Sequence, residues 1–82
     1  KAVGYYDLIA KNNEAIIKAI QEADMIFWSS YSQFKAYKRF AKTSVIHSCA
    51  GGETATLMIE SGIKPIIFPT IKSFEQWRTN IQ

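Results

Sequence analysis

Short apolar runs alternate with amphipathic segments along this chain, and that alternation restricts the architectures it can adopt. Residues 25–28 form a continuous apolar run, which is typical of a strand covered on both faces. Residues 44–48 and 65–68 are two further short strands by pattern. Because strands and helices alternate strictly, the economical arrangement is a parallel sheet joined by right-handed helical connections. The sequence therefore predicts an α/β fold with a three-stranded parallel sheet and flanking helices.

Four amphipathic segments surround these strands. Residues 14–23 have the spacing of an amphipathic helix, and Asn12 or Asn13 is placed to cap its first turn. A second helix follows a serine-rich turn, and a third ends before Gly62, where left-handed backbone is expected. The last helix has Ser73 as its predicted cap. It is expected to turn three apolar side chains inward, those of Phe74, Trp77 and Ile81.

Three loops follow the carboxyl ends of the predicted strands, at residues 29–32, 49–54 and 69–73. In open parallel sheets, ligands bind outside these strand ends. All three loops are rich in glycine or hydroxyl residues, and backbone N–H groups at helix starts can bind an anion. Each loop taken alone is better explained by ordinary turns and helix caps. The three together indicate a binding cleft.

Composition and charge exclude several classes of protein. No apolar run approaches the roughly 20 residues that span a bilayer, so no membrane partner is expected. The single cysteine, Cys49, fits a reducing cytoplasm, which is the expected location. Cys49 and the single histidine, His47, are too few for a zinc site, and no phosphate-binding glycine motif is present. We therefore expect no metal and no other cofactor.

A net charge of +3 suits an anionic ligand. Four cations at helical spacing form a basic stripe, defined as Lys35, Lys38, Arg39 and Lys42. A solvated helix face explains this stripe, and no aromatic residue is interleaved on it, so no nucleic-acid partner is predicted. His47 is expected mid-strand, packed instead of catalytic.

Four short patterns, in order along the chain, carry a resemblance to a known family. The first is a tyrosine, Tyr6 or Tyr5, in the segment that enters this half of the fold, and the second is an aspartate followed by a strand and a serine turn at residues 24–32. The third is the run Cys-Ala-Gly-Gly-Glu-Thr-Ala at residues 49–55, and the fourth is Gly62 followed by Pro-Thr at residues 69–70. In these patterns the chain resembles the C-terminal part of the uroporphyrinogen-III synthases. It departs from them at four positions, Ser30 for a proline, Tyr31 for a small residue, Glu53 for a hydroxyl and Ser73 for a glycine. Tyr31 and Glu53 add bulk beside the expected cleft.

The resemblance implies a two-domain fold in which the chain returns from a second domain to complete the first. Residues 1–7 would then be an inter-domain ladder strand, and residues 8–82 the C-terminal portion of one flavodoxin-like α/β domain. The missing N-terminal part of the same protein would supply the other strands and the second domain. Without it, strand 25–28 should have an open edge that is paired with another molecule, covered by a rearranged segment or poorly ordered.

The function that the resemblance implies is a lyase reaction of heme and tetrapyrrole biosynthesis. Uroporphyrinogen-III synthases cyclise the linear tetrapyrrole hydroxymethylbilane, with inversion of the last pyrrole ring and without a cofactor. Tyr6 is the candidate catalytic residue, because a phenol can assist departure of the substrate hydroxyl. A tyrosine that merely packs at the ladder is an equally simple interpretation. The candidate substrate-binding residues are Ser29, Ser30, Gly51, Gly52, Thr54 and Thr70.

The alternative from another class is a non-catalytic α/β signalling or ligand-binding domain. A response-regulator receiver would need a phosphoacceptor aspartate at the end of the first clear strand, where Trp28 and Ser29 stand. A periplasmic-binding-type module has no positive support in the sequence.

Overall fold

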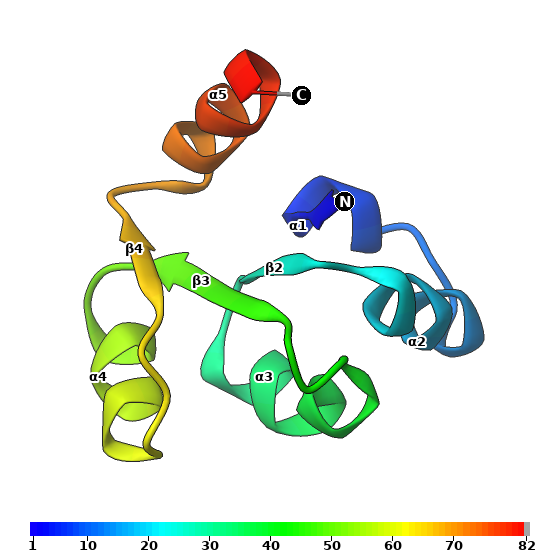
Figure 1. Ribbon diagram of the computed structural model, residues 1–82, viewed down its shortest axis with the longest axis horizontal. Helices are drawn as coiled ribbons and strands as arrows, with labels where there is room; N and C mark the ends of the chain where they lie inside the picture. The colour runs from blue at the N-terminus through cyan, green and yellow to red at the C-terminus, as the bar shows by residue number, and fades with distance from the viewer. Residues whose placement is uncertain (82) are drawn as a thin grey trace.

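The computed structural model describes the backbone of residues 1–81 and the side chains of residues 1–80. The last residue of the predicted 8–82 range, Gln82, lies outside the described residues, and so does the inward side chain predicted for Ile81. Four parallel strands form one sheet in the order of the chain (Figure 1). They are β1 (Ala2–Val3), β2 (Met25–Trp28), β3 (Ile46–Ala50) and β4 (Ile66–Phe68).

The α/β class and the adjacent parallel strands are confirmed, but the predicted strand number was wrong. The sheet has four strands, because Ala2 and Val3 pair in parallel with Met25 and Ile26. The expected open edge of β2 is therefore covered by a segment of the same chain. The strand predicted at residues 44–48 begins two residues later, since the Val45 N–H donates to the Lys42 carbonyl in a turn (3.1 Å).

Helices cover both faces of the sheet. They are α1 (Tyr5–Leu8), α2 (Asn13–Glu22), α3 (Tyr31–Tyr37) with the 3₁₀ turn η1 (Lys38–Phe40), α4 (Glu53–Glu60) and α5 (Ile71–Ile81). Right-handed connections between strands in chain order return on the same side, so the helices between strands share one face. Of the longer helices, α2, α3 and α4 pack on one face and α5, which follows β4, packs on the other; in Figure 1 α5 is above the sheet, and α3 and α4 are below it.

The core sits on both faces of β2, as its unbroken apolar pattern predicted. All four of its side chains are buried. Ile26 and Trp28 pack in the cluster under α2, α3 and α4, while Met25 and Phe27 pack in the cluster under α5. Phe74 of α5 is fully buried there, with its ring centroid 4.9 Å from that of Phe27.

The ends of two helices test the predicted caps. The φ angle of Gly62 is 89°, and the Ile63 N–H donates to the Met58 carbonyl (3.0 Å), which confirms the predicted left-handed end of α4. The predicted cap of the last helix was wrong. Thr70 caps α5, because its Oγ1 accepts the N–H of Ser73 at 3.1 Å.

Two expectations about domain organisation stay predictions. They are the ladder role of residues 1–7 and the assignment of residues 8–82 to part of a larger domain. Among the described residues, no helix combines the length and apolar character needed to cross a membrane.

Gly4 lies between β1 and α1, where the chain passes closely under α5. A Cβ atom added to Gly4 would stand 2.7 Å from Cε2 of Phe74 and 2.7 Å from Oε2 of Glu75. The turn and the buried aromatic ring are therefore in contact with no space between them. Any side chain at residue 4 would push α5 away from the sheet.

We predict that Gly4→Ala lowers the free energy of unfolding of the protein by about 1–3 kcal/mol, the usual cost of overpacking. The matched control is Gly51→Ala, whose added methyl would meet only Cγ2 of Ile67 at an ordinary 3.7 Å. Gly51→Ala should change stability by less than about 0.5 kcal/mol. Urea unfolding measures both, and equal effects would contradict the close approach at Gly4.

Candidate functional site

The carboxyl ends of all four strands lie along one edge of the sheet, here called the rim. Pairing in parallel places Trp28 opposite Cys49, and Ala50 opposite Phe68. The loops that follow these strands therefore start side by side. In this way the structure brings Ser29, Ser30, Gly51, Gly52, Thr54 and Thr70 to one edge, as predicted from the topology. Their binding role stays a prediction.

The serines of the first rim loop are already engaged in local hydrogen bonds. Ser30 caps α3, and its Oγ accepts the N–H of Gln33 at 3.1 Å. Ser29 donates both its N–H and its hydroxyl to Oε1 of Gln33, each at 3.0 Å. Ser30 keeps its own O–H hydrogen, because Oγ acts as an acceptor in the cap. Of the two serines, Ser30 is the one with a donor left for a ligand.

The second rim loop differs, because its helix start carries no side-chain cap. Gly52 is the N-cap of α4 and has a φ of 91°, which favours glycine. The first backbone N–H groups of α4 consequently have no side-chain oxygen bound to them. Thr54 is half-buried in this first turn, and its hydroxyl has no hydrogen-bond partner among residues 1–80. This loop offers the most free donors on the rim.

In the third rim loop, Thr70 serves its own helix. Its Oγ1 accepts the Ser73 N–H and lies 3.1 Å from the Ser73 hydroxyl. The capping interpretation that the sequence left open for these loops therefore holds for Thr70 and Ser30. It does not hold for Thr54.

Tyr6, the candidate catalytic residue, is largely exposed. It is the second residue of α1, just after the carboxyl end of β1, and 61% of its surface is accessible. Its ring meets only that of Tyr5 edge-on, with centroids 5.3 Å apart. The Tyr6 hydroxyl has no hydrogen-bond partner within the part of the chain that the structure describes. The phenol is therefore available to a ligand at the rim.

The two bulky departures from the family pattern have different consequences. The Tyr31 hydroxyl is 2.8 Å from that of Ser61, at the end of α4 remote from the rim, so this side chain packs along α4. Glu53 is exposed in the first turn of α4. Its negative charge stabilises the N-terminus of α4 through the helix dipole, but it repels an anion bound beside it.

His47 is packed, as predicted. Its Nδ1 accepts the indole N–H of Trp28 at 2.9 Å, and the side chain is half-buried. Burial and then the nearby Lys38 charge lower the pKa of His47 below its ordinary value of 6.5. A neutral ring is also the form that can accept from Trp28. The residue therefore stabilises the core beneath the rim.

Sequence reasoning missed one charged cluster near the rim, here called the Arg78 network. Arg78 of α5 donates to the carbonyl of Ala2 (3.1 Å) and to the carboxylates of Asp7 and Glu75. Asp7 also accepts the N–H of Gly4 at 2.7 Å. Burial tends to raise the pKa of Asp7, but the hydrogen bonds from Arg78 and Gly4 outweigh it and hold that pKa below 3.8.

One part of this network had a sequence signal. An acidic residue three positions after a helix N-cap is typical of a capping box, and Asp7 stands there relative to Gly4. No sequence pattern links Asp7 to Arg78, 71 residues further along the chain.

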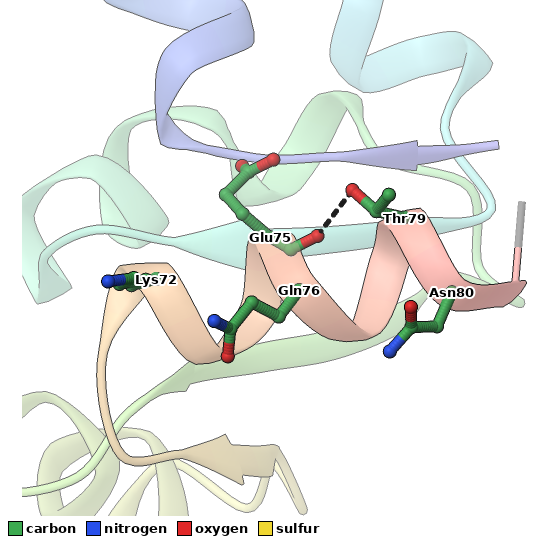
Figure 2. Close-up of a pocket in the computed structure, with 5 residues that line it drawn as sticks. All are labelled: Lys72, Glu75, Gln76, Thr79 and Asn80. Carbon is green, nitrogen blue, oxygen red and sulfur yellow. Dashed lines mark hydrogen bonds between the residues drawn. The ribbon is translucent and has the colours of Figure 1, made fainter.

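Two surface depressions lie away from the predicted site residues. One of about 430 Å³ follows a polar stripe of α5, shown in Figure 2 and lined by Lys72, Glu75, Gln76, Thr79 and Asn80. The other, about 320 Å³, is lined by residues of β1 and by charged residues of α1, α2 and the segment between them. Within residues 1–80, no group of three or more His, Cys, Asp or Glu side chains is placed to hold a metal ion.

Comparisons with models of protein families, with curated proteins and with solved structures found no match to this chain.

The Thr70 hydroxyl caps a helix and the Thr54 hydroxyl has no hydrogen-bond partner among the described residues, and this difference leads to a stability prediction. Thr70→Ala removes a cap and should lower the free energy of unfolding by about 1 kcal/mol. Thr54→Ala removes a hydroxyl without a partner and should change stability by less than about 0.5 kcal/mol. Urea unfolding of the two variants checks the difference. A larger loss for Thr54→Ala would mean that its hydroxyl serves the fold and is not free for a ligand.

Proposed function

We propose that this chain is the C-terminal part of a cytoplasmic uroporphyrinogen-III synthase, which cyclises hydroxymethylbilane and inverts its last pyrrole ring. One observation carries the proposal. The loops that resemble the family in sequence are the loops that the parallel sheet gathers at one rim. The family patterns and the place where such a sheet binds ligands therefore coincide.

The chemistry of the rim suits the substrate, which carries acetate and propionate arms. Free donors there are the first N–H groups of α4, the Thr54 hydroxyl and the remaining hydrogen of Ser30. Backbone N–H groups at a helix start bind carboxylates without a positive side chain. Gly51 and Gly52 are both exposed, so a ligand can approach the backbone closely.

The reaction needs orientation more than strong acid–base chemistry. When the substrate hydroxyl takes up a proton and leaves as water, and the pyrrole nitrogen gives up its proton, the resulting azafulvene is electrophilic at the methylene carbon that carried the hydroxyl. The substituted carbon of the last pyrrole then attacks, and the resulting spiro intermediate fragments and recloses with that ring inverted. Tyr6 assists the first step by donating a hydrogen bond to the departing oxygen. The other rim residues hold the carboxylates so that the two ends of the substrate meet.

The N-terminal part of the same protein is the proposed partner of this chain. On its outer side, β1 has no neighbouring strand among residues 1–81, and a depression lies beside it. An edge strand with unpaired backbone groups is a natural place for a further strand to bind. The second domain would then close over the rim.

We predict that the complete protein converts hydroxymethylbilane into the type III isomer with no added metal or nucleotide. Chromatographic separation of the type I and type III products is the measurement. The control is the substrate alone, which closes spontaneously to the type I isomer. If the folded complete protein yields only type I, the proposal fails and a non-catalytic binding or signalling role becomes the better account.

We also predict that the 82 residues on their own produce no type III isomer above the spontaneous background. In the family the cleft lies between two domains, and this chain provides one side of it. The same chromatographic assay applies to the purified 82-residue chain. Type III product from it would mean that the rim alone is sufficient.

A further inference from the structure

The position of Tyr6 depends on what holds a very short helix. α1 contains only four residues, and a single helical turn is not stable by itself in water. Tyr6 makes no hydrogen bond within the described residues and is largely exposed, so its own side chain anchors nothing. Leu8 is buried at the end of the turn. The start of the turn must be held by other contacts.

Those contacts come from the Arg78 network. One guanidinium nitrogen of Arg78 binds both the Ala2 carbonyl in β1 and the carboxylate of Asp7, the neighbour of Tyr6. The same carboxylate oxygen of Asp7 accepts the Gly4 N–H at the start of α1. The segment from Ala2 to Asp7 is thus fastened on both sides of Tyr6 by one side chain.

Arg78 is itself held rigidly. Its second terminal nitrogen binds Glu75 one turn earlier in α5, and its guanidinium lies 5.4 Å from the centre of the buried Phe74 ring. A planar guanidinium held by two carboxylates and an aromatic ring has little rotational freedom. Its charge is already matched by Asp7 and Glu75, so it is not available to bind a substrate carboxylate.

We propose that Arg78 is a positioning residue, which fixes the α1 turn to α5 and so sets where the Tyr6 hydroxyl stands at the rim. The inference rests on the proposed function, because it takes Tyr6 as the group that assists departure of the substrate hydroxyl. It adds a residue of α5 that contributes to catalysis without touching the substrate.

The test uses Arg78→Met and Tyr6→Phe in the complete protein, alone and combined. We expect each single variant to lower kcat for the type III product about 10-fold, with KM changed less than about twofold. Both variants weaken the hydrogen bond that assists departure of the substrate hydroxyl, which is a step after substrate binding. The double variant should be no slower than Tyr6→Phe, since Arg78 acts only through Tyr6. A loss from Arg78→Met that is equally large in the Tyr6→Phe background would overturn the inference.

Arg39→Met is the matched control, because Arg39 also lies over an aromatic ring, that of Phe40 at 4.8 Å, but belongs to the basic stripe on η1. It should leave kcat unchanged. If Arg78→Met fails to fold, Asp7→Asn replaces it, since the amide oxygen still accepts the Gly4 N–H while the ion pair is lost. Arg78→Lys should restore part of the rate, because an ammonium still reaches one acceptor.

A readout independent of activity separates this inference from the proposed function. In protein labelled with ¹³C-tyrosine, the ring resonance that disappears in Tyr6→Phe is that of Tyr6. Arg78→Met should shift and sharpen this resonance, and Arg39→Met should not. An unchanged Tyr6 resonance in Arg78→Met would overturn the positioning role even if the protein makes the type III isomer. A shifted resonance in a protein that makes only type I would support the positioning while the proposed function fails.

Discussion

The burial of β2 on both faces is the constraint on which the rest of this structure depends. Strands that follow one another in chain order bring their connecting helices to one face, and the other face would be left in water. Met25 and Phe27 point to that second face, so it has to be covered. α5 covers it by crossing back from β4, and Phe74 fills the space against Phe27. The close approach at Gly4 and the Arg78 network both follow from that crossing.

The rim shows how a small fold divides hydroxyl groups between structure and ligand binding. Ser30 and Thr70 complete the first turns of α3 and α5, which leaves them few free hydrogen-bonding atoms. α4 instead begins at Gly52, and its first N–H groups stay free. The helix without a side-chain cap is therefore the best anion-binding part of the rim, and Thr54 adds a hydroxyl to it. Glu53 is the one residue there that works against an anionic ligand.

The parts of the fold that came from local patterns were predictable, and the parts that depend on distant contacts were not. The apolar run of β2, the helix near residues 13–22 and the glycine end of α4 each have a local signal. A strand was expected within residues 1–7, but its parallel pairing with Met25 and Ile26 has no local signal and depends on the rest of the fold. Thr70 and Ser73 are both capping residue types, and the sequence does not show at which of them α5 begins. For the site, the topology predicted which loops meet, whereas the link from Asp7 to Arg78 joins residues far apart in sequence.

The position of α5 also has a consequence for the order in which the protein matures on the ribosome. Everything that α5 covers is synthesised before it: β1, β2 and β4 each contribute an apolar side chain to that face. Until residues 71–81 have left the exit tunnel, β1 to β4 and their connecting helices can form while the aromatic surface on the other face stays bare. During that interval the surface around Phe27 and Phe68 is open to chaperones and to other nascent chains. The face around Phe27 is covered only once α5 has been synthesised.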